Sequence, residues 1–225
     1  MEDVATLPVN EIFETIQGEA AFTGAPAVFV RLQGCPVLCP WCDTRHTWVV
    51  DPANEVDAQA MLAKPGDAPT FARYTPDVLA QHVLITTRAR HVVITGGEPA
   101  LYDLRRLSQA LIEAGRSVQL ETSGTHAIRI HPRAWVTVSP KLDMPGGLQM
   151  RFDAIARADE IKWPVGKAAD VDRLQNFLQR YGIEADTVWL QPLSQNPKAT
   201  ALCIEAATAN GWRISVQTHK YLGVR

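Results

Sequence analysis

The chain has 225 residues, of which 46% are hydrophobic and 20% are charged, and its formal net charge at pH 7 is -2. This composition is ordinary for a globular protein and excludes disorder on a large scale, and without a long run of Lys or Arg a nucleic-acid partner is not expected. The N-terminus "MEDVATLPVN" lacks an apolar signal segment, and no window approaches the ~18 apolar residues of a membrane span. We therefore expect a cytoplasmic protein without a membrane partner, whose thiols stay reduced.

The first strong strand is expected at 27–33, "AVFVRLQ", and the loop that follows it, "GCPVLCPWCDT", contains three of the four cysteines. Cys35, Cys39 and Cys42 have the spacing C-x3-C-x2-C, and two prolines prevent an ordinary helix through the loop. In a reducing compartment, such a cluster favours metal binding over disulfide formation. Three thiolates on one short loop can each bind a different iron of a 4Fe-4S cube, which leaves the fourth iron open to a small molecule.

A structural zinc site is an alternative explanation for this loop. His46 follows the cysteines closely, and zinc accepts a Cys3His ligand set when all four ligands come from the protein. The remaining cysteine, Cys203, lies on the apolar face of a predicted helix, where a free thiol is usually a small core residue. The residues of the loop alone leave both an iron-sulfur enzyme and a zinc-binding module open.

The rest of the chain predicts repeated strand and helix units. Residues 46–75 contain three prolines and show weak periodicity, so we expect an irregular insertion before a helix that begins near Thr75. Further strands are predicted at 91–95, 117–121, 134–139, 159–163, 187–191 and 212–217, and helices at 103–115, 170–182 and 197–211. This pattern predicts an α/β fold in a single domain of residues 1–225, an open or partial βα barrel of about six parallel strands with its chemistry at their carboxyl ends.

Two glycines follow the strand at 91–95, within the motif "TGGEP" (95–99). Glycines at the end of a strand let the main chain approach a ligand closely. Together with the cysteine loop, in which Trp41 precedes the last cysteine, this motif resembles the radical S-adenosylmethionine superfamily. The resemblance implies a barrel of the radical SAM type, a 4Fe-4S cluster on the three cysteines, and an S-adenosylmethionine whose methionyl amino group lies near Gly97 and Glu98. In that superfamily, reductive cleavage of the cofactor produces a 5'-deoxyadenosyl radical.

Four further segments narrow the resemblance. "ETIQGEAAFTG" (14–24), "ETSGT" (121–125), "VSPK" (138–141) and "QTHKYL" (217–222), taken with the cysteine loop, resemble the 7-carboxy-7-deazaguanine synthase family from near residue 10 to the C-terminus. The resemblance implies a lyase that contracts the ring of 6-carboxy-5,6,7,8-tetrahydropterin to 7-carboxy-7-deazaguanine with loss of ammonia, in the queuosine pathway of tRNA modification. Ala20 and Gly223 depart from the family pattern, which has Gly and Asn at these positions.

The same resemblance implies a role for particular residues. Magnesium is expected on Thr44, since this hard cation keeps waters and substrate oxygens in its shell and needs few protein ligands. The residues expected to bind S-adenosylmethionine are Trp41, Cys42, Asp43, Gly97, Glu98, Ser139, Pro140, Lys141, Gln191, Pro192, Leu193 and Ser194. Those expected to bind the substrate are Ile16, Gln17, Gly18, Glu19, Arg31, Thr95, His219 and Arg225.

The chemistry of a pterin agrees with the substrate set, because a flat ring with polar edges and a carboxylate calls for an amide, an acid and a guanidinium. Gln17 and Glu19 can bind the ring edge, and Arg31 can bind the carboxylate through two N–H donors. Reductive chemistry also implies an electron donor such as flavodoxin or ferredoxin, and the edge of an open sheet makes a homodimer reasonable. An alternative within the superfamily is an activase that installs glycyl radicals on a protein.

Overall fold

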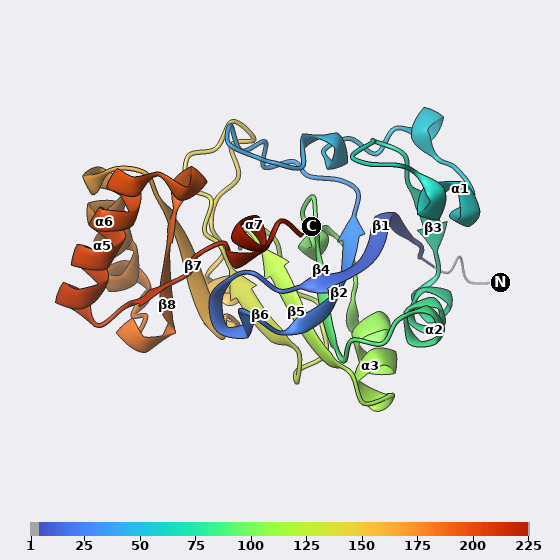
Figure 1. The fold of residues 1–225 in the computed structure, drawn as a ribbon. Helices are drawn as coiled ribbons and strands as arrows, with labels where there is room; N and C mark the ends of the chain where they lie inside the picture. Colours follow the sequence, from blue (N-terminus) through green and yellow to red (C-terminus); the bar gives the residue numbers. More distant parts are fainter. Residues whose placement is uncertain (1–4, 225) are drawn as a thin grey trace.

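The computed structural model describes residues 5–224, which form nine strands, seven α-helices and six short 3-10 helices (Figure 1). The strands are β1 (Leu7–Ile16), β2 (Pro26–Leu32), β3 (Ala72–Tyr74), β4 (His91–Gly96), β5 (Ser117–Thr122), β6 (Trp135–Val138), β7 (Glu160–Val165), β8 (Val188–Pro192) and β9 (Arg213–Ile214). The α-helices are α1 (Ala58–Ala63), α2 (Pro76–Thr86), α3 (Arg105–Glu113), α4 (Phe152–Ala156), α5 (Ala168–Tyr181), α6 (Pro197–Asn210) and α7 (Thr218–Leu222). The 3-10 helices are η1 (Ala20–Phe22), η2 (Arg45–Thr47), η3 (Pro52–Asn54), η4 (Pro99–Leu101), η5 (Ala185–Thr187) and η6 (Leu193–Gln195).

All nine strands belong to one open sheet, in the order β3-β1-β2-β4-β5-β6-β7-β8-β9. The seven strands from β2 to β9, apart from β3, are parallel to one another, whereas β1 is antiparallel to both β2 and β3. The α/β class and the open sheet are confirmed, but the predicted number of about six strands was too low. The sequence analysis overlooked β1 because a register shift between Val9 and Glu11 interrupts the alternation of its side chains.

The helices predicted from apolar periodicity correspond to α3, α5 and α6. Helix α2 begins at Pro76, and the Thr75 hydroxyl accepts a hydrogen bond from the Val78 N–H at 3.4 Å, as expected for a helix cap. Residues 46–75 contain η2, η3, α1 and β3. No helix formed by residues 5–224 is long and apolar enough to cross a membrane.

The two faces of the sheet have opposite character. On the outer face, side chains such as Val30, Ile94, Leu120 and Ile161 are almost completely buried in the apolar core, which includes residues of α2, α3, α5 and α6. Because side chains alternate along a strand, the residues between them point to the inner face, and many of these are polar. They include Arg31, Thr95, Gln119, Glu121, Thr137, Glu160, Lys162 and Gln191. The apolar face therefore stabilises the fold, and the polar face is available for chemistry.

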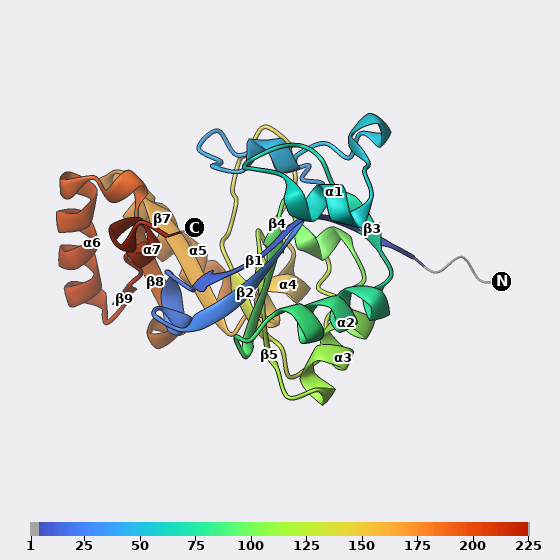
Figure 2. The same ribbon diagram turned by 45° about the vertical axis from the view of Figure 1, so that its right-hand side comes forward.

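The sheet curves so that the turn after β1 comes close to β8 and β9 (Figure 2). The segment after β1 is hydrogen-bonded to the segment after β9, through the Thr218 N–H and the Gly18 carbonyl at 3.0 Å. The Ala20 N–H donates to Ser215 Oγ at 2.9 Å across the same gap. This curvature gathers the carboxyl ends of the parallel strands around one interior space, with α7 lying across it.

Candidate active site

Two adjoining cavities lie at the carboxyl ends of the parallel strands. The larger has a volume of about 360 Å³ and the smaller a volume of about 230 Å³. They share a wall, formed by Glu19, Asp43, Thr44, Thr95, Gly96, Glu121 and Lys162. Two molecules bound in these cavities would therefore lie side by side.

The cysteine loop contributes all three of its cysteines to the larger cavity. Two backbone hydrogen bonds close the base of this loop, from the Gly34 N–H to the Thr47 carbonyl at 2.7 Å and from the Cys35 N–H to the Trp48 carbonyl at 2.9 Å. Between them the chain turns through Leu38, which has a left-handed φ of 59°. The loop is thus a closed unit that presents three free thiols to one space.

The thiols are in surroundings that disfavour a bare thiolate. Burial raises the pKa of the Cys35 thiol to about 11 and also raises the pKa of Cys39. A thiolate at these positions therefore needs a nearby positive charge, which a bound metal cluster supplies. Across residues 5–224, no group of three or more His, Cys, Asp and Glu side chains is placed to hold a single metal ion.

His46, the fourth ligand of the zinc alternative, lies apart from the residues that line this cavity. Burial lowers the pKa of its imidazole, and the charges that act on it are those of Asp67, Arg31, Glu11 and Lys64, on β1, β2 and the 46–75 segment. The histidine therefore faces a different part of the molecule from the thiols.

The "TGGEP" loop packs directly against the start of the cysteine loop. The Glu98 N–H donates to the Gly34 carbonyl at 2.7 Å. A Cβ atom on Gly97 would lie 2.2 Å from the Gly34 oxygen and 3.1 Å from the Cβ of Cys35, so only glycine fits at this contact. The two sequence motifs are therefore joined by main-chain contact.

The Glu98 side chain is 1% exposed and is held by the "ETSGT" segment. Its carboxylate accepts hydrogen bonds from the Thr122 hydroxyl at 2.6 Å, the Ser123 N–H at 2.8 Å and the Ala100 N–H at 3.0 Å. Most of its capacity as an acceptor is thus used inside the protein, although Glu98 also lines the larger cavity.

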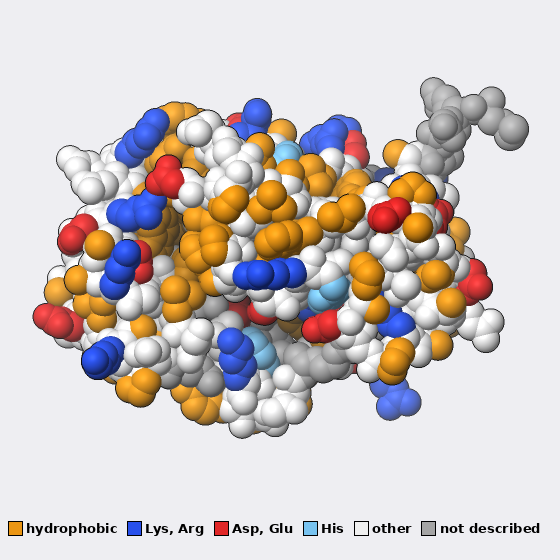
Figure 3. All heavy atoms as spheres, turned by 90° about the horizontal axis from the view of Figure 1, so that it is seen from above, with side chains coloured by type: hydrophobic (Ala, Val, Ile, Leu, Met, Phe, Trp, Pro, Cys, Tyr) orange, Lys and Arg blue, Asp and Glu red, His pale blue; other side chains and the backbone are white. Residues whose placement is uncertain are grey.

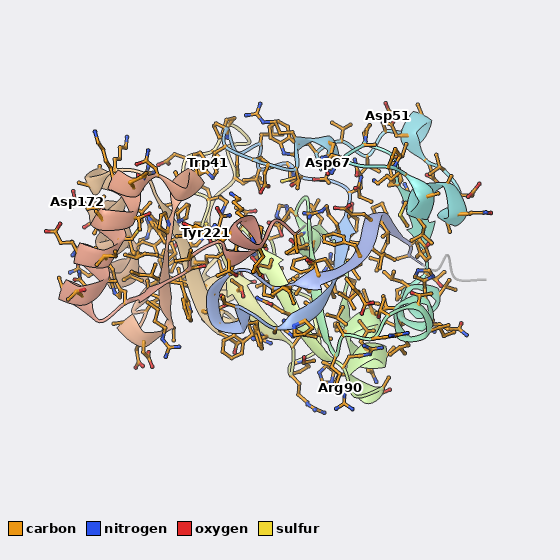
Figure 4. All side chains as sticks on the ribbon, viewed as in Figure 1. Trp41, Asp51, Asp67, Arg90, Asp172 and Tyr221 are labelled. Atoms are coloured by element: carbon orange, nitrogen blue, oxygen red, sulfur yellow. The ribbon has the colours of Figure 1, made fainter. Side chains whose placement is uncertain are left out.

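The other residues predicted to bind the cofactor gather around the same cavity. Its lining includes Trp41, Asp43, Ser139, Lys141, Gln191, Leu193 and Ser194, whereas Pro140 and Pro192 are not part of it. The half-buried Lys141 donates to the carbonyl of Ser139 at 2.9 Å and to its hydroxyl at 2.5 Å. Trp41 is 48% exposed and lies on the cysteine loop at the outer side of the cavity (Figure 4).

Seen from the side of the cysteine loop, hydrophobic side chains gather in the middle of this face, with charged side chains of both signs spread around them (Figure 3).

The smaller cavity contains the residues predicted to bind the substrate. Phe13 and Phe29 stack with their ring centroids 5.3 Å apart, and beside them Arg31 Nε donates to Glu11 Oε1 at 2.5 Å. The predicted residues that line this cavity are Ile16, Gln17, Gly18, Glu19, Arg31, Thr95 and His219. The structure therefore brings together residues from both ends of the chain.

His219 packs against the main chain of Gly18. A Cβ atom at Gly18 would lie 2.1 Å from His219 Nδ1, so the closeness of the two segments requires glycine here. Burial lowers the pKa of His219, which favours the neutral imidazole at pH 7. Arg225, also predicted to bind the substrate, lies outside the described residues.

Three charged side chains that were not predicted to act together form a group that we call the charge cluster, made of the half-buried Glu19 and Glu121 and the buried Lys162. Lys162 Nζ donates to Glu19 Oε2 and to Glu121 Oε2, each at 2.5 Å. Gln217 Nε2 donates to the other oxygen of Glu19 at 2.7 Å. The signal that could have revealed it is a lysine between Ile161 and Trp163 in a predicted strand.

The ion pair controls the charge of Glu19. Burial by itself would raise the pKa of this carboxyl, but the Lys162 ammonium and the hydrogen bonds from Lys162 and Gln217 hold the pKa at about 2. Burial by itself would lower the pKa of Lys162, and the two carboxylates raise it. Glu19 and Lys162 are therefore both charged at pH 7.

These features define an α/β protein whose site combines a three-thiol loop with an adjoining polar pocket. No family model matches the chain. The chain is 50% identical over 219 residues to the 7-carboxy-7-deazaguanine synthase of Escherichia coli (strain K12), covering 96% of this chain and 98% of that protein. It is 39% identical over 220 residues to the enzyme of the same name from Buchnera aphidicola subsp. Schizaphis graminum, covering 97% and 99%.

A crystal structure of QueE from Escherichia coli is similar, with a TM-score of 0.89 and 47% sequence identity over 94% of each chain. The chain therefore belongs to the 7-carboxy-7-deazaguanine synthase family, as its motifs predicted.

Proposed function

We propose that this chain is a radical S-adenosylmethionine lyase that converts 6-carboxy-5,6,7,8-tetrahydropterin to 7-carboxy-7-deazaguanine with loss of ammonia, in the biosynthesis of queuosine and other 7-deazapurines. Identity of 50% to a named synthase over nearly the whole chain supports this activity. The observation that carries the proposal is the pair of cavities with a common wall, because one contains the three thiols and the other contains Arg31 and Gln17.

The donor set fits a 4Fe-4S cluster, since three free thiols line one cavity and their burial calls for a compensating charge. Cys35, Cys39 and Cys42 would hold it. When bound, the cluster and S-adenosylmethionine would supply the radical chemistry that the removal of a hydrogen atom from the substrate requires. The residues that would hold S-adenosylmethionine are Trp41, Cys42, Asp43, Gly97, Glu98, Ser139, Pro140, Lys141, Gln191, Pro192, Leu193 and Ser194.

Thr44 would bind magnesium. Its hydroxyl lies 3.6 Å from Cys42 Sγ, and the residue lines both cavities. A cation held there would be next to both ligands, and hard oxygen donors of the substrate and water would complete its shell.

The protein's own residues would bind and orient the pterin. Arg31, which Glu11 orients through Nε, would bind the carboxylate of the substrate. Gln17 and Glu19 would bind the edge of the ring, and Ile16, Gly18, Thr95 and His219 would enclose it. We extend this substrate set to Arg225, which follows α7.

We further propose that the curved sheet is a partial barrel of the radical SAM type, that residues 1–225 form one domain, and that 46–75 is an insertion in it. A cytoplasmic location, an electron donor such as flavodoxin or ferredoxin, and a homodimer complete the proposal. Neither alternative, a glycyl-radical activase or a Cys3His zinc module, is favoured by the relatives.

The decisive experiment is a turnover assay under anaerobic conditions. The protein is reconstituted with iron and sulfide and incubated with the pterin, S-adenosylmethionine, magnesium and dithionite. We expect 7-carboxy-7-deazaguanine to form only in the complete mixture. Iron-loaded protein that forms no product, or that fails to bind the pterin in calorimetry, contradicts the proposal, and colourless protein loaded with zinc would support the zinc module instead.

A further inference from the structure

Lys162 connects the two acidic residues Glu19 and Glu121 in the common wall between the cavities. It lies on β7, and the two carboxylates that it bridges come from separate parts of the chain, Glu19 from the segment after β1 and Glu121 from β5. Its side chain is 9% exposed and theirs are each 15% exposed. The three charges are therefore largely shielded from water but border both cavities.

The charge cluster is linked to the residue proposed to bind the ring edge. The Gln17 side chain donates to Glu121 Oε1 at 3.4 Å and to Gln119 Oε1 at 3.2 Å. Its own Oε1 accepts a hydrogen bond from the Glu19 N–H at 3.2 Å. Gln17 is therefore held by the Glu121 carboxylate on one side and by the Glu19 main chain on the other, which fixes the orientation of its amide beside the charge cluster.

We infer that Lys162 is a positioning residue for the substrate: by bridging Glu19 and Glu121 at the common wall, it keeps Glu19 in a fixed orientation as a hydrogen-bond acceptor for the N–H edge of the pterin. The inference rests on the proposed function, because the pterin is the ligand that it concerns. Lys162 itself need not touch the pterin for this role.

The physical reason is the low polarity of the surroundings. Two carboxylates that share a buried site repel each other, and without a cation between them one takes up a proton. Glu19 already accepts hydrogen bonds from Lys162, Gln217 and Gln191, which leaves it little further capacity as an acceptor. A protonated Glu19 would become a donor at one oxygen and would lose the acceptor site that it offers to an N–H of the ring edge. Without the lysine charge, Glu19 should take up a proton at pH values at which it is ionised in the native protein. Pterin binding by such a variant should therefore change with pH in a range where binding by the native protein does not.

Other charged and titratable groups face the cluster from the neighbouring elements, and they are unchanged in every variant below. They are Glu160 on β7, Lys141 after β6, Glu98 after β4, Asp43 on the cysteine loop, and His219 and Lys220 on α7. Comparison of each variant with the native protein at the same pH removes their contribution and the titration of the pterin itself.

The test is calorimetric titration of the reconstituted holoenzyme with the pterin, from about pH 5.5 to about pH 8.5, in two buffers with different heats of ionisation. Lys162→Met and Lys162→Gln remove the charge, Lys162→Arg keeps it, and Lys198→Met on the exposed start of α6 is the matched control. Lys162→Gln keeps a polar group, so it replaces Lys162→Met if the latter fails to fold.

We expect the neutral variants to bind the pterin at least about tenfold more weakly than the native protein at pH 7, with a larger loss at lower pH. They should also release a fraction of a proton on binding, because Glu19 must ionise to accept the ring edge. Lys162→Arg should show a smaller loss that does not change with pH, and Lys198→Met should bind normally.

Two outcomes overturn the inference. One is native affinity in the neutral variants. The other is a loss that is the same at every pH, without proton release, and equally large in Lys162→Arg, since that is the behaviour of a residue needed only for folding. Failure of the native protein to bind the pterin would overturn the proposed function and this inference with it. If the native protein binds the pterin, the affinities of the variants test the inference separately.

Discussion

The cysteine loop and the charge cluster face the same cavity, but they are assembled in opposite ways. The three thiols come from residues 35–42 of one loop, which is closed by its own backbone hydrogen bonds. The charge cluster joins residues that are 143 and 41 positions apart, and it exists only because the sheet curves. The proposed metal ligand set is thus local, whereas the polar wall proposed to orient the substrate depends on the whole fold.

The largest effect should come from removing a thiol from the cysteine loop. Cys35→Ala removes one of three thiols, so the protein should lose most of its roughly four irons per chain and its cleavage of S-adenosylmethionine. Iron analysis and detection of 5'-deoxyadenosine measure both. Cys203→Ala is the control: this buried thiol on α6 should cost about 1 kcal/mol of unfolding free energy and leave the iron content intact. A Cys35→Ala protein that keeps a full cluster would contradict this assignment.

A smaller effect should follow from separating the cysteine loop from the "TGGEP" loop. Gly97→Ala places a Cβ 2.2 Å from the Gly34 oxygen, so the "TGGEP" and cysteine loops must separate. Turnover should fall by about 10²-fold, since a misplacement of ~1 Å costs about that much. Gly66→Ala is the matched control, because nothing lies within 4 Å of its added Cβ, and it should behave as the native protein. Equal activities of the two variants would show that the contact is unimportant.

The pH dependence of the unfolding free energy tests the ion pairs of the charge cluster. The folded pKa of Glu19 is about 2, below its usual 4.5, so its contribution is complete above pH 4.5 and is lost as the pH falls toward 2. Glu19→Gln lacks this group, and the difference in unfolding free energy between the two proteins should shrink over that range. The raised pKa of Lys162 contributes stability that is complete and constant below its usual value of 10.5 and is lost only as the pH rises above it, so it adds no pH dependence here. Urea denaturation from about pH 5 to about pH 3 measures the difference; a constant value would exclude a strong ion pair.

The smallest effect is expected at Ala20, where the family pattern has glycine. Ala20 has a left-handed φ of 53°, which costs an L-residue ~1 kcal/mol or more. Ala20→Gly removes that strain, but it also removes a buried methyl, worth about 0.8 kcal/mol, and increases the freedom of the unfolded chain by a similar amount. The unfolding free energy should therefore change by less than about 1 kcal/mol. A change above about 2 kcal/mol in urea denaturation would show that the backbone strain, the buried methyl group or the freedom of the unfolded chain contributes much more than these values.

Much of the fold was predictable because its signals are local. Apolar periodicity located α3, α5 and α6, and the β-rich runs located the parallel strands. Strand β1 was missed because its bulge interrupts the alternation, and β3 has only three residues. Both depend on pairing with strands that the chain supplies elsewhere, which a scan of neighbouring residues does not detect.

The same division holds for the site. The sequence by itself determined the family, the three thiols and the glycine motif, because spacing along a short loop controls which atoms can reach one metal cluster. Only the tertiary structure decided that Gln17 lies between Glu19 and Glu121 and that Lys162 compensates their charge. The reason is that burial and curvature decide which distant charges meet, and electrostatic interactions become strong only where water is excluded.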